Sequence, residues 1–193
     1  MITYEVSKAD IERVQKKLKG MEKDAPKVIK NAINKTAREA RRKLAEGAQS
    51  AYTVKMAGWN SRMKIQNATV GNLEAIIRVK DRPLTTTRFS HRANKKKQGG
   101  AAASADIVKG GLKEIISRYS GTTGTRIKAF KANGLIMQRQ TVDRLPVKVL
   151  RSNSVPKMIE KVYQGERGID RQLKDTINQA LQRNIGAEIE KLL

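Results

Sequence analysis

A short alternating segment and a stretch of helical spacing open the chain. Residues 2–6 alternate apolar and polar side chains, which predicts a half-buried strand. Ser7 can then cap a helix, because Asp10 follows three residues later in an acidic variant of the capping box. The apolar face of this expected helix consists of Ile11, Val14, Leu18 and Met21.

A second helix is expected over residues 25–47. Asp24 suits a helix cap and Pro26 suits a first turn, while Gly47 is a plausible stop. The apolar stripe of this helix consists of Ile29, Ile33, Ala37, Ala40 and Leu44. The pattern leaves open whether there are two helices or one helix bent near Pro26.

The sequence pattern in the centre of the chain predicts β-strands. Residues 64–70 and 73–80 read as a hairpin with Gly71-Asn72 as its turn. Further strands are expected at residues 105–109, 126–131, 135–140 and 145–150. The second and third of these are joined by Ala132-Asn133-Gly134, an Asn-Gly hairpin signal.

A long irregular basic stretch interrupts this pattern. We expect a flexible basic loop at about residues 82–104, because the segment lacks regular spacing and ends in Gly99-Gly100. A short helix is expected near residues 157–163 and a final helix over about 168–191. The order of elements predicts one α+β domain spanning residues 1–193. Its mainly antiparallel sheet of about five strands packs against a long N-terminal helical segment and a C-terminal helix.

The charge of the chain points to an anionic partner. The 193 residues include 41 Lys and Arg against 18 Asp and Glu, a net charge of +23, and the pI is about 10.5. An excess of this size is typical of proteins that bind polyanions. Charge alone does not separate DNA, RNA, an acidic protein and an anionic lipid, and a solvated surface that binds nothing specific remains open.

Enzyme chemistry finds little support. The chain has no cysteine and a single histidine, His91, with no acidic residue near it in sequence to orient the ring. Glu160 and Glu166 are spaced like ordinary helix-surface charges, and the glycine-rich segment at 109–112 lacks the Walker pattern. We therefore expect no catalytic site, no metal and no cofactor. No apolar run is long enough to cross a membrane, and no secretory signal peptide is expected.

Two basic groups are the candidates for binding nucleic acid. Arg38, Arg41 and Arg42 form a fixed stripe on the second helix. The basic loop supplies Arg88, Arg92, Lys95, Lys96 and Lys97. Aromatic residues make up only 4% of the chain and no helix-turn-helix is visible, so binding would depend on charge and shape. A membrane-surface helix is less suitable, because the apolar face is rich in alanine and lacks Trp and Phe.

Three strings resemble one family of phage proteins. Residues 24–45 read DAPKVIKNAINKTAREARRKLA, residues 52–55 read YTVK, and residues 144–159 read RLPVKVLRSNSVPKMI. In this order, with a strand-forming start, they resemble the phage and prophage minor tail protein Z family, the tail completion proteins. The resemblance runs over nearly the whole chain, except for residues 85–125.

The resemblance implies a structural role in the virion. It suggests a tail completion or neck subunit at the head-proximal end of a long tail, assembled in the host cytoplasm. It also implies a homo-oligomer in a six-fold ring, bordered by tail tube or terminator and head-connector proteins, with phage DNA in its lumen and no membrane partner. A free, non-specific nucleic-acid-binding protein is the alternative, and a basic enzyme such as a nuclease is the third hypothesis.

Overall fold

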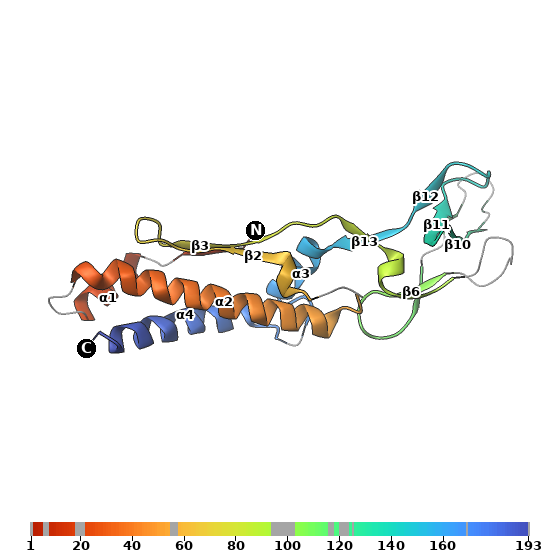
Figure 1. The fold of residues 1–193 in the computed structure, drawn as a ribbon. Helices are drawn as coiled ribbons and strands as arrows, with labels where there is room; N and C mark the ends of the chain where they lie inside the picture. Colours follow the sequence, from red (N-terminus) through yellow and green to blue (C-terminus); the bar gives the residue numbers. More distant parts are fainter. Residues whose placement is uncertain are drawn as a thin grey trace. The chain divides into compact units, whose positions relative to one another are not determined.

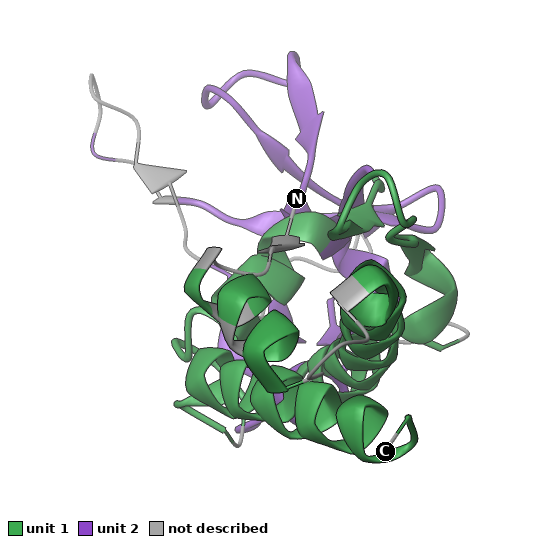
Figure 2. Ribbon diagram, turned by 90° about the vertical axis from the view of Figure 1, so that its left-hand side faces the viewer, with its two compact units in different colours: residues 1–48, 58–81, 156–193 green, residues 49–57, 82–155 purple. Residues whose placement is uncertain are grey.

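The computed structural model describes most of the chain, in two compact units (Figure 2). The described residues are 2–5, 8–17, 22–54, 58–93, 103–115, 118–119, 124, 126–168 and 170–192. Unit 1 comprises Met1–Ala48, Gly58–Asp81 and Pro156–Leu193. Unit 2 comprises Gln49–Ala57 and Arg82–Val155.

Unit 1 is built around the long helix α2 (Ala25–Ala51), whose last three residues belong to unit 2. It follows α1 (Lys8–Lys17) and the 3-10 turn η1 (Glu22–Asp24). Because η1 separates them, α1 and α2 are two helices and not one bent helix. The stripe expected for α2 is confirmed, since Ile29, Ile33, Ala37, Ala40 and Leu44 are all fully buried. Ser7, Leu18 and Met21 lie outside the described residues.

The sequence predicted that this helix ends at Gly47, and this prediction is wrong. α2 continues four residues further, to Ala51. A Cβ atom at Gly47 would lie only 2.6 Å from Cγ1 of Val162, which belongs to α3 (Val155–Tyr163). The glycine is therefore explained by the close approach of another helix to α2 and not by a left-handed helix cap.

The C-terminal helix α4 (Leu173–Glu190) lies along α2 (Figure 1). Its buried residues Leu181, Ile185 and Ile189 join a core cluster with Val28 and Ile29 of α2. The final helix expected over about 168–191 is confirmed, and its apolar residues Leu173, Ile177, Leu181, Ile185 and Ile189, which recur every four residues, are all buried.

An antiparallel sheet in the order β1–β3–β2 completes unit 1. Its strands are β1 (Ile2–Glu5), β2 (Met63–Gln66) and β3 (Glu74–Val79), and the turn η2 (Asn60–Arg62) precedes β2. The predicted pairing of these two segments is confirmed, but β2 ends at Gln66, so the connection is residues 67–73 and not Gly71-Asn72 alone. Asn34 of α2 clamps the hairpin loop, because its Nδ2 donates to the Ala68 carbonyl at 3.0 Å and its Oδ1 accepts from the Ala68 N–H at 2.7 Å.

Unit 2 consists of short antiparallel strands. They are β4 (Pro83–Thr85), β5 (Ser90–Arg92), β6 (Ser104–Asp106), β7 (Lys113–Glu114), β8 (Arg118–Tyr119), β9 (Arg126–Ile127), β10 (Ala129–Ala132), β11 (Leu135–Arg139), β12 (Val147–Val149) and β13 (Arg151–Ser154), with the 3-10 turn η3 (Thr86–Arg88) after β4. The predicted Asn-Gly hairpin is confirmed between β10 and β11. Asn133 and Gly134 have φ values of 49° and 71°, as a type I′ turn requires.

The first part of the expected basic loop is regular structure, which corrects the prediction for residues 83–92. β4 pairs with β13, 68 residues later, and β5 pairs with β6. Phe89 is fully buried, and Thr86 is bonded to the Leu150 carbonyl through both its N–H and its hydroxyl. These long-range contacts leave no periodic trace in the sequence. Residues 94–102 lie outside the described residues.

The predicted α+β class, with antiparallel strands, a long N-terminal helix and a C-terminal helix, is confirmed. Within the described parts of the chain, the strands form five separate sheets of two or three strands each and are not gathered in one five-stranded sheet.

Candidate nucleic-acid interface

The positive charge of the chain is concentrated in unit 2. Counted from the sequence, unit 2 holds 17 Lys and Arg against 3 Asp and Glu, a net charge of +14. Unit 1 is the larger unit, yet it holds 24 against 15, a net charge of +9. An anionic partner would therefore meet the densest positive potential on unit 2.

The α2 stripe is present on unit 1, although its charge is partly compensated. Arg38 and Arg42 are exposed one helical turn apart, while Arg41 is half-buried. The carboxylate of Glu46 lies 3.8 Å from Arg42, an exposed ion pair that contributes little to stability. Two exposed guanidinium groups at a fixed helical spacing can contact phosphates without reading bases.

The candidates of the basic loop divide between described and undescribed residues. Arg88 ends η3 and Arg92 ends β5, and both side chains are exposed. The fully buried Phe89 anchors the segment between them, so these two arginines are held on ordered elements. Lys95, Lys96 and Lys97 lie outside the described residues. The predicted residues thus fall into two groups, one on each unit.

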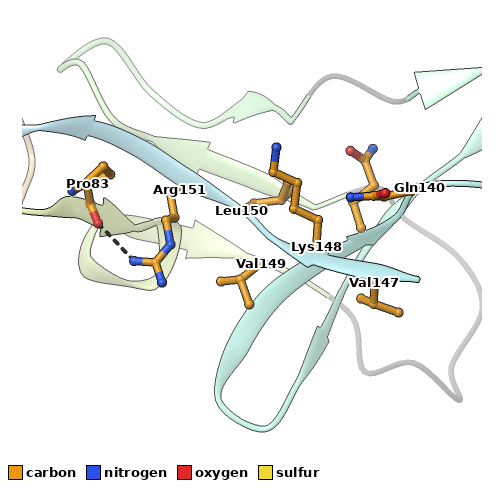
Figure 3. Close-up of a pocket in the computed structure, with 8 residues that line it drawn as sticks. Pro83, Gln140, Val147, Lys148, Val149, Leu150 and Arg151 are labelled. Atoms are coloured by element: carbon orange, nitrogen blue, oxygen red, sulfur yellow. Dashed lines mark hydrogen bonds between the residues drawn. The ribbon is translucent and has the colours of Figure 1, made fainter. Parts of the chain in front are cut away.

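A basic groove in unit 2 lies beside β12 and β13 (Figure 3). Its volume is about 780 Å³, and Lys148 and Arg151 are among the residues that line it. None of the described residues that line it is acidic. Arg151 donates to the Pro83 carbonyl at 3.2 Å, which holds its guanidinium at the groove wall. In Figure 3, Val147 and Val149 lie on one side of β12 and Lys148 on the other. The groove offers cationic and amide groups suited to a phosphate backbone.

Several exposed lysine and arginine residues lie outside the two groups that were predicted from the sequence. In unit 2 these are Arg82, Lys109, Lys113, Lys128, Arg144, Lys148 and Arg151. Their signal is in the local charge count, since residues 82–155 alone contain 16 Lys and Arg against 3 Asp and Glu. These lysine and arginine residues are far apart in the sequence, so the excess of positive charge is not evident as a basic run. The fold brings them together in one unit.

The features considered for catalysis have structural contacts. His91 Nδ1 lies 3.0 Å from the carbonyl oxygen of Phe89. Glu160 and Glu166 are each paired with a lysine, Lys157 and Lys161, at 3.0 Å. Among the residues that the structure describes, no group of three or more His, Asp or Glu side chains could hold a metal ion. The described helices also include none that is long and apolar enough to span a bilayer.

A protein family matches this chain over nearly its whole length. The family model described as prophage minor tail protein Z (GPZ) matches residues 10–193. No curated protein and no solved structure gives a significant match. The family match includes residues of both compact units, so it concerns the chain as a whole.

Proposed function

This chain belongs to the prophage minor tail protein Z family, and on that premise we propose that it completes a phage tail and joins it to the head. Membership of a phage tail family makes it a structural component that assembles with other proteins of the virion. The finer role proposed here is that of a non-enzymatic subunit at the head-proximal end of a long tail. Both units act together in this role as one tail-completion protein, with the family match over residues 10–193 as the observation that carries it.

We propose further that copies of the chain form a ring around the DNA channel, six-fold as the family resemblance implies. Six copies at +23 each carry +138 in total. B-DNA presents one charge per about 1.7 Å, so a ring about 40 Å tall would surround only about two dozen phosphates. DNA alone therefore cannot balance the ring, and acidic surfaces of neighbouring tail and connector proteins take up the remainder.

The DNA-facing part of this charge is proposed to lie mainly on unit 2. Arg88 and Arg92 are exposed on ordered elements there, and the groove beside β12 adds Lys148 and Arg151. Lys95, Lys96 and Lys97 are proposed to extend the same function. Arg38, Arg41 and Arg42 of α2 would contact DNA or an acidic neighbour. In each case the contact is with phosphate or carboxylate and is independent of base sequence.

Head joining can be tested with tails made without this protein. Tails assembled from a phage whose gene for this chain is deleted are mixed with filled heads, with and without the purified protein. The proposal expects headless tails in the absence of the protein and infectious particles after its addition. Normal numbers of infectious particles from the deletion phage would refute the proposal.

A free DNA-binding protein remains the second candidate, favoured by the +14 charge of unit 2. It predicts that the isolated protein binds duplex DNA tightly, with affinity that falls steeply with salt. It also predicts that purified virions lack the protein. Quantitative mass spectrometry of washed virions separates the two functions.

A further inference from the structure

An exposed loop of unit 2 presents apolar side chains to solvent. Among the described residues, the large apolar side chains that are exposed are Val70, Leu112, Val142 and Leu145. Val142 and Leu145 lie within one loop of residues 140–146, between β11 and β12, and Leu145 is the most exposed of the four at 70%. We call residues 140–146 the apolar loop. Two large apolar side chains are thus exposed within three residues of each other in sequence, and exposed apolar surface of this kind can serve as a contact between proteins.

The apolar loop is closed by hydrogen bonds within the loop. The Gln140 N–H donates to the Pro146 carbonyl at 3.0 Å, which joins the two ends of the loop. The Thr141 hydroxyl donates to Asp143 Oδ2 at 3.2 Å. A closed loop loses less conformational entropy on binding than an open one, so it is suited to present Leu145 to a partner.

A cavity of unit 1 has the size and chemistry to receive this side chain. It has a volume of about 210 Å³ and is lined by Lys43, Glu46, Gly47, Val162, Asp170 and Leu173. Val162 and Leu173 are buried residues that contribute apolar surface to the cavity. A cavity of about 150 Å³ with apolar walls can hold a benzene molecule, so this cavity has room for a leucine side chain.

The charges of the two surfaces are complementary. The apolar loop carries Asp143 and Arg144 directly before Leu145. The cavity is lined by two acidic groups, Glu46 and Asp170, and one basic group, Lys43. Both oxygens of Asp170 already accept hydrogen bonds, from Gln172 and Thr176. Among the described residues, Glu46 has only its exposed contact with Arg42 at 3.8 Å. With Leu145 in the cavity, Arg144 would therefore pair with Glu46, and Asp143 with Lys43. Such pairing selects one partner and one orientation.

We propose that the apolar loop of one copy inserts Leu145 into this cavity of unit 1 on a second copy. Both surfaces belong to the same chain, so every copy can give one loop and receive another. A contact between two different surfaces repeats head to tail and closes into a ring or extends as a filament. The contact deepens the proposed ring and rests on that part of the proposed function.

Disulfide trapping tests the contact in the purified full-length chain, which has no native cysteine. A chain with Arg144→Cys is mixed with a chain of different mass that carries Glu46→Cys, under mild oxidation. The proposal expects a mixed disulfide dimer to accumulate about tenfold faster than with the control Leu112→Cys paired with Glu46→Cys. Leu112 is the matched control, since it is an exposed leucine of the same unit. Equal rates for the two pairs would overturn the proposal.

One double variant identifies the occupant of the cavity. A chain that carries both Arg144→Cys and Glu46→Cys is expected to form a ladder of dimers, trimers and larger species. A monomer with an internal disulfide would show that the loop meets the cavity of its own chain, which would overturn the proposal of a second copy.

The role of the leucine is tested in the background of the trapping pair. Leu145→Asp, introduced into the Arg144→Cys chain, is expected to lower trapping about tenfold, whereas Leu112→Asp leaves it unchanged. An equal effect of the two substitutions would contradict the insertion of Leu145. The trapping assay needs no phage, so its result is independent of the head-joining assay. If trapping is lost but head joining is normal, the proposed contact is refuted and the proposed function stands. If trapping occurs but tails do not need the protein, the proposed function is refuted and the contact stands.

Discussion

Asn184 of α4 donates its side-chain amide to the hydroxyl of Thr36 on α2 at 3.0 Å, and both residues are buried. The Thr36 hydroxyl in turn donates to the Ala32 carbonyl at 2.8 Å. The Asn184 amide also lies 3.4 Å from Glu39 Oε1, and Arg183 binds the other oxygen of that carboxylate at 2.7 Å. This polar seam fixes which residues of the two helices face each other, which apolar packing alone does not specify.

Replacing Asn184 by alanine is expected to lower the free energy of unfolding by about 1–3 kcal/mol, because buried polar groups lose their partner. Asn178→Ala is the matched control, since Asn178 is exposed on the same helix. Urea denaturation of the two variants measures the difference. Equal stability of the two variants would show that the seam has no energetic role.

Two helical glycines should respond oppositely to alanine. A Cβ atom at Gly186 of α4 would meet no heavy atom within 4 Å beyond its chain neighbours and its own helix backbone, so Gly186→Ala should stabilise the protein by about 0.5–1 kcal/mol. Gly47→Ala places a methyl group 2.6 Å from Val162 Cγ1 and should destabilise it by about 1–3 kcal/mol. Because Val162→Ala removes the methyl group that the new Cβ would meet, Gly47→Ala should cost less in a Val162→Ala background than in the wild type. Stabilisation by Gly47→Ala in thermal unfolding would contradict the close approach of α2 and α3.

Glu188 should make part of the stability dependent on pH. A hydrogen bond from Lys191 lowers the pKa of Glu188 below its ordinary value near 4.5, and Asn31 adds a second one. Because the folded pKa lies below the unfolded one, this stabilisation is present above about pH 4.5 and is lost as the pH falls through the folded pKa.

Glu188→Gln should therefore reduce stability at neutral pH and lose less stability than the wild type between about pH 5 and pH 3. Glu190→Gln, at an exposed position of the same helix, serves as the control. Denaturation curves across this range measure the effect. Parallel curves for wild type and Glu188→Gln would mean that the Lys191 contact is absent in solution.

Exposed lysine and arginine residues of unit 2 should determine how strongly DNA binding depends on salt. Arg88→Ser with Lys148→Ser is expected to weaken binding and to reduce the slope of log K against log salt by about 1.8, or about 0.9 per lost phosphate contact. The control is Arg171→Ser with Lys174→Ser, which removes two exposed basic side chains of unit 1. Fluorescence anisotropy with duplex DNA gives both slopes. A larger change from the control pair would place the DNA surface on unit 1.

The elements that could be predicted from the sequence are those with a local signal. The apolar residues of α2 recur at three or four residues and those of α4 every four, and the turn at Asn133 and Gly134 has strict backbone requirements. The segment 83–92 gives no such signal, because its order comes from pairing with β13 and from the burial of Phe89.

The strings that carry the family resemblance have different roles in the structure. In residues 31–37, Asn34 clamps Ala68 and Thr36 meets Asn184, so polar residues that look like surface positions hold the fold together. In residues 144–147, by contrast, Arg144 and Leu145 are exposed. Residue type did not distinguish a buried asparagine from an exposed one, and it did not reveal an exposed leucine. These assignments require the three-dimensional contacts.

The central claim is that this chain is a built-in component of the tail at its head-proximal end. Electron microscopy of purified virions, labelled with gold-conjugated antibody against the chain, tests this claim most directly. The account predicts gold at the junction of tail and head in intact virions, and at one end of isolated tails. Virions without label, while the free protein is found in the lysate, would contradict it.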